Sequence, residues 1–109
     1  MDWLAETCRH RGPDERLNGA ALAAALEGLP GWQMAADGSD IYQEFKRSDY
    51  AAVLALVNAV AAVAQRQDHH PEVCFGYNTC RVSFGTHSAG GVTANDLICA
   101  AWVNRFAGG

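Results

Sequence analysis

The most apolar stretch of the chain, Tyr50 to Ala64, limits the possible folds more than any other segment. A single polar side chain, Asn58, interrupts it. At about 15 residues, the stretch is shorter than the roughly 20 residues that a membrane-spanning helix needs. Charged residues also bound it closely on both sides, namely Lys46, Arg47, Asp49 and Arg66. We therefore expect a buried helix of a soluble protein, with no part inserted in a membrane.

One face of this helix repeats apolar side chains at the helical period of 3.6 residues, and Ser48 or Asp49 can cap its start. The repeating residues are Val53, Leu56, Val57, Val60, Val63 and Ala64. The other faces are mostly alanine, so they are apolar as well. Because a helix that is apolar nearly all round must be covered, we expect a second face to support self-association.

Length, charge and cysteine pattern exclude several classes of protein. The chain has 109 residues, of which 50% are hydrophobic, so one domain can build its own core. The formal charge is −4 and the basic residues are scattered, which argues against nucleic-acid binding. The first residues lack the features of a signal peptide, so we expect a cytoplasmic protein. Four cysteines without a C-x-x-C pair indicate reduced thiols, which we expect to be buried.

The segment before the apolar helix predicts one helix and two short strands. Asn18 can cap a helix over Gly19 to Leu29, which Pro30-Gly31 would stop. Strands are expected at Trp32 to Ala36 and at Asp40 to Arg47, because apolar and polar residues alternate there around an Asp-Gly-Ser turn.

A second hairpin and a final helix are expected after Pro71. With a two-residue turn at Asn78-Thr79, the expected cross-strand pairs are Tyr77 with Cys80, Phe75 with Val82, and Val73 with Phe84. Thr93 to Asp96 would open the last helix, which continues to Phe106. The order α-β-β-α-β-β-α predicts an α+β fold, in which helices cover one face of a four-stranded antiparallel sheet.

Three of the four histidines flank the ends of this second hairpin. His69 and His70 precede Pro71, which ends the helix before them, and His87 follows the last strand. The hairpin would bring these ends together, so we expect the three side chains to share a pocket. Imidazole titrates near neutral pH, so such a cluster favours proton transfer or metal binding.

A set of residues and motifs follows in a distinctive order along the chain. It consists of Leu29-Pro30-Gly31-Trp32, Phe45, the apolar helix, Asp68-His69-His70-Pro71-Glu72, Tyr77, Val82, Thr86-His87, Gly91-Val92-Thr93 and Asp96. Over the span from about Leu29 to Phe106, this set resembles the pterin-4a-carbinolamine dehydratase family. The resemblance implies an enzyme that dehydrates 4a-hydroxytetrahydropterin to quinonoid dihydropterin and water. It also implies a pterin substrate, no cofactor or metal, and assembly into homodimers or homotetramers.

The resemblance further implies roles for individual residues. His69 and His87 would form the acid/base pair, and His70 would bind and position the pterin. Asp68, Gly85, Thr86 and Ser88 would line the pterin beside the three histidines, and Trp32 could reach it too. Asp96 would either cap the last helix or orient a histidine.

Four residues depart from this pattern, namely Gln65, Val73, Gly85 and Ser88. Gln65 stands where the family commonly has an acidic residue, four positions before His69. At helical spacing the amide could reach His69, but it would not favour the imidazolium form as a carboxylate would.

The fourth histidine, His10, lies between two arginines, and we expect it to be exposed and inert.

Two alternatives stay open beside the dehydratase. The three histidines and Asp96 could in principle hold zinc, although their order matches no H-E-x-x-H signature. The same fold could also serve as a protein-interaction module, since animal members of the family are dimerisation cofactors of a transcription factor. We interpret residues 17–109 as the dehydratase-like domain and residues 1–16 as an extension that could be flexible.

Overall fold

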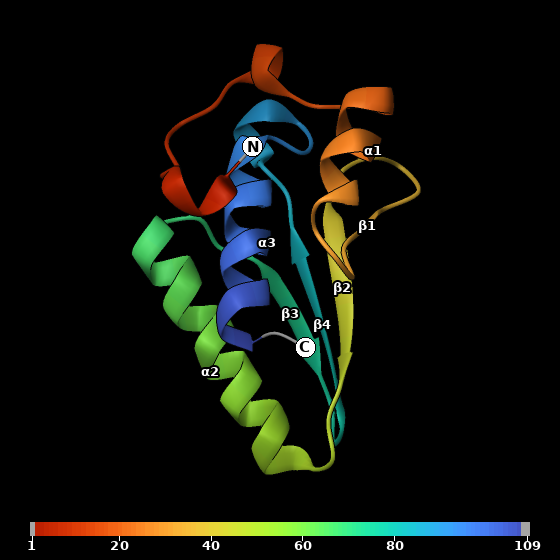
Figure 1. Ribbon diagram of the computed structural model, residues 1–109, viewed down its shortest axis with the longest axis vertical. Helices are drawn as coiled ribbons and strands as arrows, with labels where there is room; N and C mark the ends of the chain where they lie inside the picture. The colour runs from red at the N-terminus through yellow and green to blue at the C-terminus, as the bar shows by residue number, and fades with distance from the viewer. Residues whose placement is uncertain (1, 108–109) are drawn as a thin grey trace.

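The computed structural model describes residues 2–107 and contains the predicted α+β fold (Figure 1). Its helices and strands are α1 (Gly19–Glu27), β1 (Gln33–Met34), β2 (Ile41–Lys46), α2 (Tyr50–Gln67), β3 (Glu72–Phe75), β4 (Thr79–Phe84) and α3 (Ala94–Ala107). Short 3-10 helices lie at η1 (Trp3–Ala5), η2 (Pro13–Glu15) and η3 (His87–Ala89). The four strands form one antiparallel sheet, in the order β1-β2-β4-β3. The predicted fold class is confirmed.

The predicted register of the second hairpin was wrong by two residues. Phe75 pairs with Cys80, and Val73 pairs with Val82. The loop is longer than the two-residue turn that we expected, and within it the Gly76 N–H donates to the Thr79 carbonyl over 3.0 Å. A shift of two residues keeps every side chain on its predicted face, because successive residues of a strand point to opposite faces.

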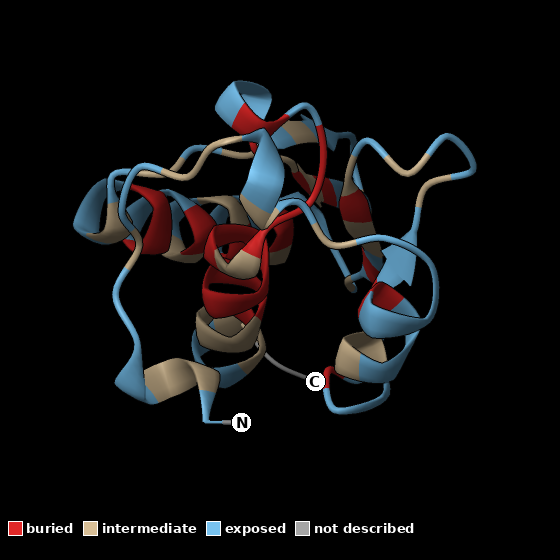
Figure 2. Cartoon of the chain, turned by 90° about the horizontal axis from the view of Figure 1, so that it is seen from above, coloured by how far each residue is buried: buried red, intermediate tan, exposed pale blue. Residues whose placement is uncertain are grey.

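Helix α2 begins after the predicted cap and buries its predicted face, and it continues past Ala64, where the apolar stretch ends, to Gln67. Asp49 is the N-cap, and its side chain accepts a hydrogen bond from Ala52 N over 2.9 Å. Of the predicted stripe, Val57 is half-buried and the other residues are buried, namely Val53, Leu56, Val60, Val63 and Ala64. Figure 2 shows these buried positions on the side of the helix that faces the rest of the molecule.

The core lies between the sheet and the helices α2 and α3. The central strand β4 buries Cys80, Val82 and Phe84, and α3 is buried along most of its length. Phe84 is fully buried and contacts the ring of Trp32, with ring centroids 5.9 Å apart. The expectation of buried thiols holds for Cys80 and Cys99, whereas Cys8 is half-buried and Cys74 is exposed on the edge strand β3.

The segment before α1 folds against the domain over the top of α3 (Figure 1). Trp3 and Cys8 are half-buried against the core, and Leu17 N donates to Val92 O over 2.7 Å. This segment therefore contacts the region where β4 and α3 meet. Within residues 2–107, no helix is both long and apolar enough to cross a membrane.

The burial of Phe84 generates a stability prediction. Phe84→Ala should lower the free energy of unfolding by about 3–5 kcal/mol, because it removes a buried ring and leaves a cavity. Urea denaturation would measure the change. Tyr77→Ala is the matched control, since Tyr77 is 67% exposed, and it should change stability by less than about 0.5 kcal/mol. Equal losses in the two variants would contradict this account of the core.

Candidate active site

A cavity of about 540 Å³ lies where α2 ends and where β4 leads into α3. The three clustered histidines all line it, as the sequence predicts. Its lining residues are Cys8, Arg9, His10, Arg11, Gln67, Asp68, His69, His70, Gly85, Thr86, His87, Ser88 and Asn95. This volume is typical of small-molecule sites.

The end of α2 positions the first histidine. Asp68 adopts the left-handed conformation with φ of 50°, which Asp tolerates better than most residues, and it ends the helix. His69 N then donates to the carbonyl of Ala64 over 3.2 Å, so the helix end remains hydrogen-bonded. Pro71 restricts the backbone of the preceding residue, His70, to extended conformations. His69 is thereby held at the boundary between helix and strand.

Asp96 lies in the first turn of α3 and is fully buried. Its Oδ2 accepts hydrogen bonds from Thr93 N over 2.9 Å and from Thr86 Oγ1 over 2.8 Å. Its Oδ1 lies 2.6 Å from Nε2 of His69. Asp96 therefore combines both roles that the sequence left open, because one oxygen caps the helix while the other holds a histidine.

The contact with Asp96 sets the protonation of His69. Burial disfavours the charged ring, but the hydrogen bond to Asp96 and the charge of that carboxylate outweigh burial and raise the pKa of His69. Since a carboxylate is an acceptor, Nε2 carries a proton. Within residues 2–107, Nδ1 of His69 has no hydrogen-bond partner, so Nδ1 is the nitrogen free to exchange protons.

The other predicted site residues lie around this pair at different depths. Thr86 is buried, Asp68 and His70 are exposed, and His87 and Ser88 are exposed in η3. Gly85 also has a structural reason to lack a side chain. A Cβ atom there would come within 2.7 Å of the Ser39 carbonyl oxygen, so the residue allows the two loops to approach closely.

Three predicted residues do not line the cavity, namely Trp32, Gln65 and Asp96, and of these Asp96 contacts the lining residue His69. Trp32 is buried in the core, where its Nε1 donates to Asn104 Oδ1 over 2.9 Å. Gln65 is exposed on α2, and Gln67 lines the cavity instead. The helix rotates by about 100° per residue, so a position two residues further along the chain faces another direction.

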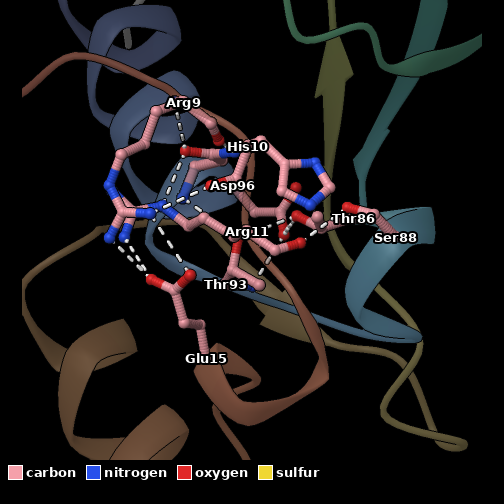
Figure 3. A network of polar contacts seen from close by, with 9 residues as sticks. Arg9, His10, Arg11, Glu15, Thr86, Ser88, Thr93 and Asp96 are labelled. Atoms are coloured by element: carbon pink, nitrogen blue, oxygen red, sulfur yellow. Dashed lines mark hydrogen bonds and ion pairs between the residues drawn. The ribbon is translucent and has the colours of Figure 1, made fainter.

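The N-terminal segment forms a wall of the cavity that was not predicted from the sequence. Residues 8–11 line it, and Asn95 anchors them from the position next to Asp96. Figure 3 shows Arg9, Arg11 and Glu15 joined in one network with the threonines of the site. Asn95 Oδ1 accepts from Arg9 N over 3.1 Å and from Arg11 Nε over 2.8 Å. No local pattern in the sequence indicates these contacts.

The alternative of a zinc site requires at least three ligand side chains around one point. In the part of the chain that the structure describes, no three side chains of His, Cys, Asp or Glu are arranged to bind a common metal ion.

The sequence matches a known protein family over most of its length. The sequence profile of the family described as pterin 4 alpha carbinolamine dehydratase matches residues 15–106. The chain belongs to the pterin-4-alpha-carbinolamine dehydratase family. The match begins at residue 15, before Leu29, the first residue of the resemblance described above, and residues 8–11 lie outside it.

Relatives within the dehydratase family cover most of the chain. A protein of Paracoccus denitrificans is 46% identical over 92 residues, which are 84% of this chain and 86% of the relative. One of Stenotrophomonas maltophilia is 43% identical over 91 residues, which are 84% of this chain and 78% of the relative. Both relatives carry a provisional assignment as a pterin-4-alpha-carbinolamine dehydratase.

Solved structures share the fold. A transcriptional coactivator/pterin dehydratase from Brucella melitensis superposes with a TM-score of 0.80 at 35% identity, over 85% of this chain and 99% of that one. A pterin dehydratase-like RuBisCO assembly factor of the alpha-carboxysome has a TM-score of 0.61 at 23% identity, over 72% of this chain and 90% of that one. The second likeness concerns the fold alone.

The pairing with Asp96 generates a prediction for the pKa of His69. Asp96→Asn should lower this pKa, because the amide removes the negative charge while burial of the ring remains. Proton NMR titration of the histidine ring signals would measure it. Asp68→Asn removes the same charge from an exposed neighbour and is the matched control. An unchanged His69 pKa in Asp96→Asn would contradict the proposed electrostatic coupling.

Proposed function

We propose that this protein dehydrates a 4a-hydroxytetrahydropterin to quinonoid dihydropterin and water, as a pterin-4a-carbinolamine dehydratase. The observation that carries this proposal is the convergence of His69, His70 and His87 on one cavity, with His69 held by a buried carboxylate. The family and the provisional assignments of the relatives support the same reaction. A pterin is the substrate, and the proposed chemistry uses only side chains of the protein.

The reaction needs one proton donor and one proton acceptor. Breaking the bond between C4a and its hydroxyl requires a proton on the departing oxygen, because hydroxide is a poor leaving group. A base removes the N5 proton, the N5 lone pair forms the new double bond to C4a, and water leaves. The net transformation therefore consumes no proton, and histidine suits both tasks near neutral pH.

The environment of His69 supports a division of the two tasks between the histidines. The raised pKa of His69 favours its protonated form, and this form can donate from Nδ1 while Nε2 stays bound to Asp96. We therefore assign His69 as the acid and His87 as the base. His70 lies on the same cavity wall without contacting Asp96, so positioning of the pterin is its proposed role.

Single substitutions of these histidines test the proposal. His69→Ala and His87→Ala should each lower the enzyme-catalysed dehydration rate by about 10²- to 10⁴-fold, the usual contribution of general acid–base catalysis. His70→Ala should mainly raise KM. Stopped-flow absorbance with freshly generated 4a-hydroxytetrahydrobiopterin measures all three, against the spontaneous rate.

The control is Arg105→Gln, an exposed change near the end of α3 and away from the cavity. It should retain the wild-type rate. A wild-type protein no faster than the spontaneous reaction, or four variants with equal rates, would contradict the dehydratase proposal. A stable complex with a different protein, found together with an inactive wild type, would favour the protein-interaction function instead.

The expected homodimer or homotetramer stays a prediction, which an exposed apolar surface supports. Phe106 is 61% exposed and stacks on Trp102, beside Ala59, Ala62 and Val63 of α2. Covering such a surface by a second copy would remove apolar area from water. Light scattering during size-exclusion chromatography should report a mass of two or four chains. Phe106→Ser should weaken the assembly, and a monomeric wild type would contradict it.

A further inference from the structure

His10 lies in the wall of the histidine cavity, although it precedes residue 15, where the family match begins. The chain is anchored immediately before it. Cys8 N donates to Gln67 Oε1 of α2 over 3.0 Å. The side-chain amide of Asn95 accepts from Arg9 N over 3.1 Å and donates to Arg9 O over 2.6 Å. Helices α2 and α3 therefore both fix the backbone that leads into His10.

The chain is anchored again immediately after His10. Ser88 Oγ donates to the carbonyl of Arg11 over 2.7 Å, and Arg11 Nε donates to Asn95 Oδ1 over 2.8 Å. The anchoring side chain of Asn95 is almost fully buried. With positions 9 and 11 both held, the position of the His10 ring depends mainly on its own two side-chain torsions.

The side chains of this segment point in two directions. The guanidinium groups of Arg9 and Arg11 turn toward Glu15, which binds both of them. Figure 3 shows the imidazole of His10 turned the other way, toward Thr86 and Ser88 of the site. His10 is exposed, and within residues 2–107 neither of its ring nitrogens has a hydrogen-bond partner. The ring is therefore free to bind a ligand at the open side of the cavity.

We propose that His10 is a fourth histidine of the site and hydrogen-bonds the polar side chain of the bound pterin. This inference rests on the proposed dehydratase function. A neutral imidazole donates from one nitrogen and accepts at the other, which suits a hydroxylated substituent. The reacting part of the pterin would lie near His69, which is only 13% exposed, and the substituent would extend toward the open side. His10 thus contributes to substrate selection rather than to proton transfer.

Kinetics of the dehydration separate these two contributions. His10→Phe keeps a ring and removes both nitrogens, so KM should rise about threefold to tenfold, the loss expected for one hydrogen bond, with a smaller change in kcat. His10→Gln keeps a donor and an acceptor and should lose less. Thr7→Gln, an exposed change that does not line the cavity, should match the wild type. A substrate without the hydroxylated side chain should show no such KM difference between wild type and His10→Phe.

NMR provides a test that is independent of turnover. The ring signals of His10 can be assigned by their absence in His10→Phe, and added biopterin should shift them together with those of the other three histidines. Shifts at His69, His70 and His87 without one at His10, or an unchanged KM in His10→Phe, would overturn this inference and leave the proposed function standing. The absence of any shift, together with no rate above the spontaneous one, would reject both.

Discussion

The buried carboxylate of Asp96 is the interaction on which the site depends. It joins three parts of the chain, because it binds His69 after α2, Thr86 after β4 and Thr93 at the start of α3. A fully buried carboxylate is tolerated only when its oxygens are paired. The contacts that satisfy Asp96 therefore also fix the ring of His69, so the stability of this junction and the geometry of the proposed acid have one cause.

This arrangement separates histidines that look alike in the sequence. His69 is half-buried and paired with Asp96 through Nε2, whereas His70 and His87 are exposed and line the same cavity. Two groups in different environments can carry different protonation states at one pH, as acid–base catalysis requires. The proposed acid, His69, and the proposed binding residue, His70, are therefore neighbours in the chain that lie in different environments.

Local patterns predicted most of the fold. The capping residue Asp49 and the apolar period defined α2, and alternation predicted the buried residues of β4. The hairpin register needed more information, because the loop after Phe75 lacks the Asn-Gly type of turn that would determine its length. The place of Trp32 could not be predicted, because an apolar residue near a turn has the same local pattern in a core and in a pocket. In the structure it is buried in the core.

The histidine cluster could be predicted because a hairpin joins residues close together in the sequence. The wall formed by residues 8–11 could not, because its anchors come from Asn95, Ser88 and Gln67, far away along the chain. Such contacts depend on the completed fold. The proposed role of His10 follows from them and reverses the expectation from sequence that this residue is inert.

The pH dependence of kcat/KM for dehydration, compared between wild type and Asp96→Asn, tests the central claim most directly. If protonated His69 is the acid, activity falls as the pH rises through its pKa. Loss of the Asp96 charge lowers that pKa, so this fall should move to lower pH in Asp96→Asn. Profiles that fall at the same pH in both proteins would contradict the assignment of His69, held by Asp96, as the acid.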